Sequence, residues 1–127
     1  MNKGKYFLGK VQDIQYILSL EYITEVIEFT SQKLNKSLNI FIHNNIPVTL
    51  LNLYNQDYTG EFAIIFEYMG EYFALPTNEI KHVQELTELN QENIEIYNPK
   101  AGHKKTNAIV LIPSIESLLN IQPAELI

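Results

Sequence analysis

Four glutamates near one another in the middle of the chain could do acid–base chemistry: Glu61, Glu67, Glu71 and Glu79. Paired carboxylates act as general acid and general base when their surroundings separate their pKa values. Glutamates on the outward face of a β-hairpin are, however, usually solvated. We therefore prefer the interpretation that these glutamates are solvated, and we keep a hydrolase that uses Glu67 and Glu71 as a less favoured hypothesis.

The three histidines, His43, His82 and His103, fall in different expected elements and show no HxH or HExxH spacing. A zinc site needs three or four ligands close together, so this distribution predicts no metal centre. The segment PKAGHKKT at residues 99–106 lacks the second glycine and the GK[ST] ending of a P-loop. With no cysteine and no GxSxG pattern, the sequence predicts no catalytic residue and no cofactor, which favours a binding module.

The glutamates and histidines considered above must be positioned by short strands. The clearest pattern of predicted strands lies in residues 61–86. Its FAIIFEY run has strand length and is almost entirely apolar, as expected when both faces of a strand are covered. Gly70 supplies a turn, and a second strand, YFAL, is expected to stop at Pro76, which has no N–H for a ladder. Thr77 or Asn78 is expected to cap one helical turn before a third strand, KHVQEL.

This stretch has a counterpart at residues 5–29, which we interpret as an internal repeat. Ile23 aligns with Ile80 and Val26 aligns with Val83, each at an offset of 57 residues (80 − 23). Other positions keep step at the same offset: Phe7 with Ile64, Leu8 with Ile65, Tyr16 with Phe73, and Leu18 with Leu75. Self-similarity at a fixed offset indicates a duplicated unit, and chance likeness of two hairpins is the alternative.

Between the repeats, the runs LNIFIH and IPVTLL flank Asn44 and Asn45. Asparagine tolerates left-handed dihedral angles, so a two-residue type I′ hairpin is expected here. After the second repeat, the pattern predicts brief strands at residues 94–96 and 108–112, and Ser114 caps a short helix. Many short strands with little helix predict an all-β fold of two small barrels, in which two interdependent lobes of one domain share an interface.

Composition narrows the possible partners. The 127 residues carry a net charge of −6, and all nine basic residues are lysines. This acidic balance argues against nucleic acid and against anionic membrane surfaces. The N-terminal apolar run is interrupted by polar residues and no stretch is long enough to span a bilayer, so we expect a soluble, cytoplasmic protein without membrane insertion.

Four stretches, taken in order, resemble the CheW-like domain family, the adaptor fold of bacterial chemosensory arrays. They are a first hairpin followed by ITEVIEF at residues 23–29, the strand IPVTLLNL at residues 46–53, the second hairpin at residues 62–86, and AIVLIPSIESLL at residues 108–119. The chain departs from the family pattern in the turn before the proline-valine step, where FIHNNIPV stands in place of the usual Asn-Leu-Arg-Gly. It also lacks the aspartates that in the family usually follow the proline-valine strand and precede the final helix; Asn52 lies near the first position, and Pro113 or Ser114 near the second.

The resemblance implies one CheW-like domain over residues 1–127, built as two small SH3-like five-stranded β-barrel lobes with short helical turns and a short C-terminal helix. It further implies a non-catalytic adaptor that couples chemoreceptors to the histidine kinase CheA. The implied partners are the cytoplasmic helical tip of the receptor and the regulatory domain of CheA. The implied contact residues are Ile23, Val26, Ile27, Ile40, Ile42, His43, Asn44 and Asn45.

Strand alternation sharpens one part of this expectation. Val26 and Ile27 are neighbours, so they cannot both face inward, and one of them should be partly exposed beside a groove. These residues could equally serve only to fill a barrel. A peptide- or small-ligand-binding β-barrel outside chemotaxis remains the alternative function.

Overall fold

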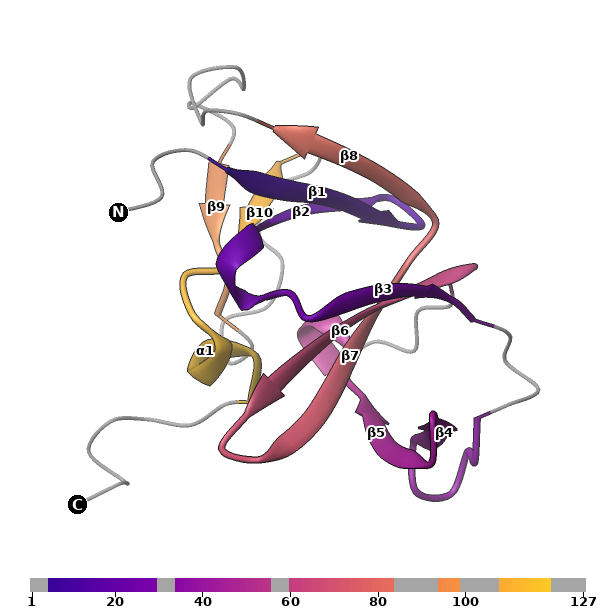
Figure 1. Cartoon of the computed structure of the whole chain (residues 1–127). Coiled ribbons are helices and arrows are strands. Elements are labelled where there is room, and N and C mark those ends of the chain that lie inside the picture. Colours follow the sequence, from indigo (N-terminus) through magenta and orange to yellow (C-terminus); the bar gives the residue numbers. More distant parts are fainter. Residues whose placement is uncertain (1–4, 30–33, 56–59, 84–93, 99–107, 120–127) are drawn as a thin grey trace.

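The computed structural model describes residues 5–29, 34–55, 60–83, 94–98 and 108–119. It is mostly β, with two five-stranded sheets and one short helix, α1 (Ile115–Leu119), which confirms the predicted all-β class. Figure 1 shows the two sheets one above the other, with α1 at one end. Single helical turns lie at Leu20–Tyr22 and Leu53–Asn55. Among the described residues, no helix has the length and apolar character needed to cross a membrane.

Sheet A is the upper sheet in Figure 1 and curls from β8 to β9. Its strands, in spatial order, are β8 (Glu79–Val83), β1 (Tyr6–Val11), β2 (Ile14–Ser19), β10 (Ile109–Leu111) and β9 (Ile94–Ile96). Sheet B lies below it. Its strands, in spatial order, are β3 (Glu25–Glu28), β6 (Phe62–Tyr68), β7 (Glu71–Thr77), β5 (Ile46–Leu50) and β4 (Ile40–His43).

Each of the three antiparallel hairpins has a tight turn between its two strands. The predicted turn between β4 and β5 is confirmed. Asn44 and Asn45 have φ values of 51° and 65°, as a type I′ turn requires at both central positions. Gly70, with φ of 83°, supplies the left-handed position between β6 and β7. The hairpin between β1 and β2 turns at residues 12–13.

The two sheets pair their strands in the same register. Phe7 lies opposite Leu18 in the hairpin of sheet A, and Ile64 lies opposite Leu75 in the hairpin of sheet B, 57 residues further on (64 − 7). Each hairpin also accepts a parallel strand at matching positions: β10 lies beside residues 15–17 of β2, and β5 lies beside residues 72–74 of β7.

The third strand of each sequence unit crosses to the other sheet. β3 follows the hairpin of sheet A but pairs with β6 in sheet B. β8 follows the hairpin of sheet B but pairs with β1 in sheet A. Each sheet therefore depends on backbone hydrogen bonds to a strand from the other half of the chain.

The predictions for residues 76–78 were wrong. β7 continues through Pro76 to Thr77, and β8 begins at Glu79 with no helical turn between them. Pro76 is tolerated because it lies opposite Ala63, between two hydrogen-bonded pairs of the hairpin, and β5 pairs with β7 only up to Ala74. Neither neighbouring strand thus needs an N–H from residue 76.

Thr77 joins the two sheets instead of capping a helix. Its buried hydroxyl accepts from the Lys10 N–H at 3.0 Å and donates to the Glu79 carbonyl at 2.7 Å. Tyr16 lies next to it, fully buried, and donates its hydroxyl to the Pro76 carbonyl at 3.0 Å. We call these contacts the junction.

Apolar side chains fill both faces of sheet B. The larger core lies between the sheets and includes Phe7, Leu18, Ile64, Phe66 and Leu75. The smaller core lies on the other face of sheet B and consists of Phe29, Phe41, Val48, Leu50, Ala63, Ile65 and Ala74. Residues 63–66 of β6 are all buried, which confirms that this apolar run is covered on both faces.

Candidate functional site

The predicted contact residues in and near β3 point in different directions. Ile23 is partly buried against the larger core. Val26 lies opposite Ile64 and is 37% exposed, whereas Ile27 packs against the smaller core. Val26 is thus the exposed member of the pair that strand alternation singled out. The three side chains do not form one continuous surface.

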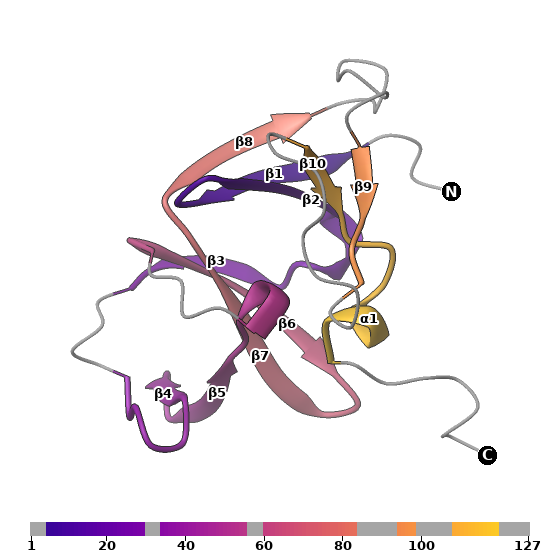
Figure 2. The ribbon, with the colours of Figure 1, turned by 180° about the vertical axis from the view of Figure 1, so that it is seen from behind.

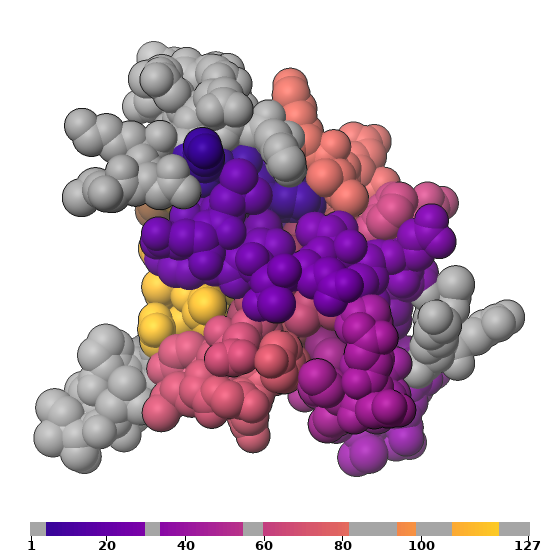
Figure 3. All heavy atoms as spheres, in the orientation of Figure 1, coloured from indigo at the N-terminus to yellow at the C-terminus, as the bar shows by residue number. Residues whose placement is uncertain are grey.

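The predicted residues in β4 and its turn lie closer together. Ile42 is 60% exposed, and its neighbours Ile40 and His43 are partly buried. Asn44 and Asn45 are exposed at the tip of the hairpin. Figure 3 shows this hairpin below β3 on one face of the molecule. The β4–β5 hairpin is therefore the part of the predicted site that solvent can reach.

The two edge strands of sheet B meet through side chains. His43 of β4 pairs with Glu25 of β3, with 3.2 Å between Nε2 and Oε2. Asn44 extends this contact, because its Nδ2 lies 3.3 Å from the same histidine nitrogen. Deeper in, the rings of Phe29 and Phe41 are 4.8 Å apart at a tilted angle. These contacts bring together strands at opposite edges of the sheet.

A small hollow opens where these edges meet. Its volume is about 150 Å³, and the residues that line it are Thr24, Glu25, His43, Asn44, Ile46, Val48, Ile65 and Tyr72. Val48 and Ile65 belong to the smaller core, so the hollow leads towards apolar side chains from a polar rim. We call it the inner hollow.

A second hollow lies across β5 from the first. Its volume is about 330 Å³, and its lining consists of Ile40, Ile46, Pro47, Thr49, Gly70, Glu71 and Tyr72. We call it the outer hollow. Ile46 and Tyr72 line both hollows, so they connect them. The hairpin surface is defined here as these two hollows together with the exposed Ile42.

Sequence reasoning missed the two residues that connect the hollows. Ile46 directly follows the predicted turn and lies opposite His43, so the hairpin pattern could have placed it in the site. Tyr72 comes from β7, whose parallel pairing with β5 places it beside Val48. No local pattern announces a parallel pairing between two such distant segments.

The hairpin surface lies on the acidic sheet. The strands of sheet B carry four glutamates and no lysine, namely Glu25, Glu28, Glu67 and Glu71. Glu67 lies opposite Tyr72 and accepts a hydrogen bond from its hydroxyl, which raises the pKa of Tyr72 above its ordinary value. Each of the two hollows has one glutamate in its lining, Glu25 or Glu71, so the hairpin surface suits a partner with apolar side chains and flanking positive charge.

The four glutamates considered for catalysis do not form a site. All four are exposed, and Glu61 and Glu79 lie outside the β6–β7 hairpin. Glu67 pairs with Tyr72 and Glu71 pairs with Tyr68, so the two glutamates occupy successive pairs that face opposite sides of the sheet. Glu67 and Glu71 are therefore not arranged as an acid–base pair.

Metal-binding groups are also dispersed in the part of the chain that the structure describes, where no three histidine, aspartate or glutamate residues come together to hold an ion. His43 is engaged with Glu25. The side chain of His82 and the whole of His103 lie outside the described residues.

Comparison with known proteins assigns no relative. No family model matches the chain, and a search of curated proteins found no significant match.

Proposed function

We propose that this chain is a non-catalytic adaptor of the CheW-like class, working in the cytoplasm. The observation that carries the proposal is the repeated sheet architecture. In each sheet, an antiparallel hairpin accepts a parallel strand on one side and a strand from the other half of the chain on the other. This exchange of strands makes the two sheets interdependent, which supports the two-lobed architecture that the resemblance implies.

The role of the adaptor is to couple chemoreceptors to the kinase CheA. The hairpin surface offers two adjacent apolar hollows and the exposed Ile42, which suit the apolar stripe of a helix such as a receptor's cytoplasmic tip. The CheA regulatory domain is the second partner, since homologous barrels can pair end to end. The net charge of −6 agrees with protein partners rather than nucleic acid.

Binding assays with two matched variants test this proposal. Ile42 of β4 and Ile96 of β9 are exposed to similar extents, 60% and 57%, on edge strands of different sheets. We expect Ile42→Asp to weaken binding to a receptor tip fragment at least about tenfold, because it places a charge in an apolar contact. Ile96→Asp should bind as the unmodified chain does.

The remaining predicted contacts need variants that preserve the fold. Val26→Asp tests the exposed predicted contact in β3, which lies outside the hairpin surface, and should weaken binding to the receptor tip if β3 contributes to the contact. For the turn, Asn44→Gly and Asn45→Gly remove the amides but allow the left-handed φ values that alanine would strain. If the unmodified chain binds neither the receptor tip nor the CheA regulatory domain, the adaptor proposal is wrong.

The alternative is a peptide- or small-ligand-binding module outside chemotaxis, and the inner hollow of about 150 Å³ favours it. It predicts no affinity for either chemosensory partner. It also predicts that an aliphatic peptide binds the hairpin surface and is released by Ile42→Asp. Measurement of both kinds of binding by the same calorimetric assay separates the two functions.

A further inference from the structure

The inner hollow combines a carboxylate with an apolar wall on one face of sheet B. Glu25 lies directly opposite Ile65 in the pairing of β3 with β6, and directly paired residues share a face. Val48 lies beside Tyr72 in the parallel pairing of β5 with β7, and both Val48 and Ile65 belong to the smaller core. Seen from behind, β3 lies above the β4–β5 hairpin (Figure 2). The Glu25 carboxylate and the apolar side chains therefore converge on the same hollow.

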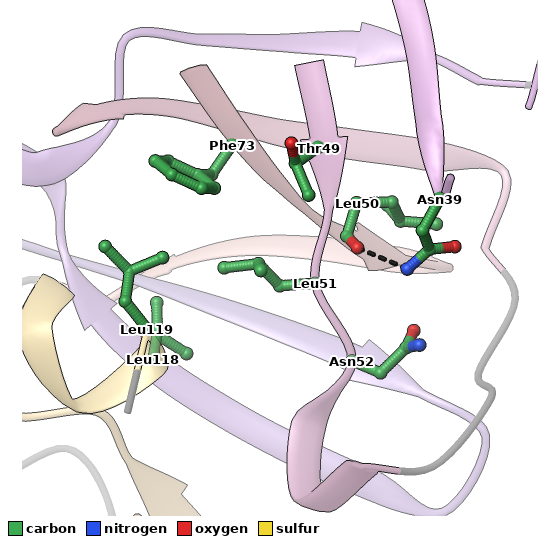
Figure 4. A pocket seen from close by; sticks show the side chains of 8 residues that line it. All are labelled: Asn39, Thr49, Leu50, Leu51, Asn52, Phe73, Leu118 and Leu119. Atoms are coloured by element: carbon green, nitrogen blue, oxygen red, sulfur yellow. Dashed lines mark hydrogen bonds between the residues drawn. The ribbon is translucent and has the colours of Figure 1, made fainter. Parts of the chain in front are cut away.

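A larger hollow beside α1 lacks this convergence. Its volume is about 540 Å³, but Phe73, Leu118 and Leu119 lie on one side of the β5 segment and Asn39 and Asn52 on the other (Figure 4). None of the described residues that line it is charged. Its apolar and polar groups do not meet around one small ligand, so we assign it no ligand.

The Glu25 carboxylate has room for a cation. Its side chain is 47% exposed, and in the described part of the chain its one hydrogen-bond or ion-pair partner is His43, which contacts Oε2 at 3.2 Å. Each oxygen of a carboxylate can accept more than one hydrogen bond, so Oε1 can accept from a further donor. An ammonium group carries three N–H donors and a charge that complements the carboxylate.

The charges around the hollow favour a cation over an anion. The strands of sheet B contain no lysine that could neutralise Glu25. Tyr72 brings a second carboxylate to the same side, because its hydroxyl donates to Glu67, the residue directly opposite it in the β6–β7 hairpin. Two carboxylates beside an apolar wall attract positive charge and leave an anion without a counter-charge.

The size of the hollow limits the ligand to a single side chain. Its volume is about 150 Å³, and a protein cavity of about this volume accommodates a molecule as small as benzene. Lysine carries its ammonium group on a flexible chain of about four carbons. Such a side chain can bury its stem along apolar surface while its charged end stays at a polar rim.

We propose that the inner hollow binds a lysine side chain presented by the partner protein. The aliphatic stem lies on Val48 and Ile65, and the ammonium group donates to Glu25 at the rim. The inference rests on the proposed function, because the inner hollow is part of the hairpin surface, and it adds the chemistry that the partner presents there.

Small analogues of the lysine side chain test the hollow without a partner protein. We would titrate the full chain, labelled with ¹⁵N, with n-butylammonium chloride and with 1-butanol, which has the same carbon chain without the charge. Butylammonium should shift the amide signals of residues 24–25, 43–46, 48, 65 and 72 in a saturable manner. It should bind at least about threefold more tightly than 1-butanol. Equal affinity of the two probes, or shifts scattered over the surface, would overturn the inference.

Two matched variants of β3 separate pairing in the hollow from general attraction. Glu25→Gln removes the charge at the hollow, whereas Glu28→Gln removes the same charge from the opposite face of the same strand. Glu25→Gln should weaken butylammonium binding at least about threefold, to the level of 1-butanol, and Glu28→Gln should leave it unchanged. An equal loss in both variants would show attraction to the acidic surface as a whole and would overturn the assignment.

Binding of a receptor tip fragment distinguishes failure of this inference from failure of the proposed function. We expect Glu25→Gln, but not Glu28→Gln, to weaken that binding as well. Full affinity of Glu25→Gln for the fragment, without a saturable shift by butylammonium, would overturn the inference and leave the adaptor proposal standing. Saturable butylammonium binding by a chain that binds neither chemosensory partner would support the chemistry of the hollow while the adaptor proposal fails.

Discussion

Sheets A and B share one strand arrangement, but they use the equivalent position in the hairpin differently. Tyr16 in sheet A is fully buried and donates a hydrogen bond to Pro76 in the other hairpin. Phe73, at the equivalent position 57 residues later (73 − 16), is only partly buried and lines a hollow. The same backbone framework therefore supports a sealed junction in one sheet and an accessible surface in the other.

The two sheets also differ in charge. The strands of sheet A carry two lysines and two glutamates, Lys10, Lys81, Glu79 and Glu95, whereas those of sheet B carry four glutamates and no lysine. Unbalanced charge around apolar hollows on sheet B favours a cationic partner. One strand arrangement can therefore place the residues that stabilise the fold in one sheet and the residues that bind other molecules in the other.

The largest expected effect comes from separating the halves of the chain. A fragment of residues 1–60 keeps β1 and β3 but loses their antiparallel partners β8 and β6. We expect it to be unfolded by circular dichroism, because each sheet needs a strand from the other half. The full chain should unfold in a single transition, and two separated transitions would show that the sheets are independent.

The next largest effect is expected at Gly60, where the junction leaves no room for a side chain. A Cβ on this residue would lie 2.5 Å from the Thr77 backbone nitrogen, and backbone cannot move aside as a flexible side chain can. Gly60→Ala should lower the free energy of unfolding by about 3 kcal/mol.

Gly70→Ala is the matched control in sheet B. It has open space around it and a φ of 83°, so only the left-handed conformation penalises the alanine, by about 1–2 kcal/mol. Urea unfolding of both variants measures the difference, and an equal loss at the two glycines would contradict the tight packing of the junction.

A smaller effect is expected when the junction loses one hydroxyl. Tyr16→Phe removes the bond to the Pro76 carbonyl and leaves that buried oxygen short of a partner. The free energy of unfolding should fall by about 1–2 kcal/mol. Tyr72→Phe, which removes a hydroxyl at the surface of sheet B, should change it by less than about 0.5 kcal/mol.

Tyr16 also makes the free energy of unfolding depend on pH in the alkaline range. Burial raises the pKa of Tyr16, and to a lesser extent burial also raises that of Tyr97. The folded state therefore holds protons that the unfolded chain releases above about pH 10, so the contribution of these tyrosines to stability is constant below that pH and is lost as the pH rises above it. Tyr16→Phe should make this fall shallower, and urea titrations between about pH 8 and pH 11 would measure both slopes.

The smallest effect is expected where the edges of sheet B meet. The pair of His43 and Glu25 is partly exposed, and such surface pairs contribute little. Glu25→Gln should change the free energy of unfolding by less than about 0.5 kcal/mol. A loss comparable to that of Tyr16→Phe would mean that sheet B relies on its edge contact as sheet A relies on the junction.

Local patterns were sufficient for the elements themselves. The Asn44–Asn45 turn, the apolar run of β6, the brief strand β9 and the short C-terminal helix all follow from neighbouring residues. Ser114 accepts the N–H of Ser117 at 3.3 Å, as its expected capping role requires. Short-range rules suffice here because turn dihedrals, alternation and caps depend on residues a few positions apart.

Local patterns failed where distant strands decide the outcome. Pro76 looked like the end of a strand, but it occupies a position where neither neighbouring strand needs its N–H. Thr77 looked like a helix cap, but its hydroxyl is used by Lys10 and Glu79 at the crossing between sheets. These surroundings of Pro76 and Thr77 form only when β7 pairs with β6 and β5 in the folded chain.

The sequence by itself determined the strands, their turns, the apolar faces and the candidate residues in the β4–β5 hairpin. Only the tertiary structure decided that β3 and β8 exchange sheets, that Tyr72 joins Ile46 between two hollows, and that Ile23 is directed to the core. The reason is physical: alternation fixes which face of a strand a residue occupies, but the partner of each edge is chosen by the packing of the whole chain.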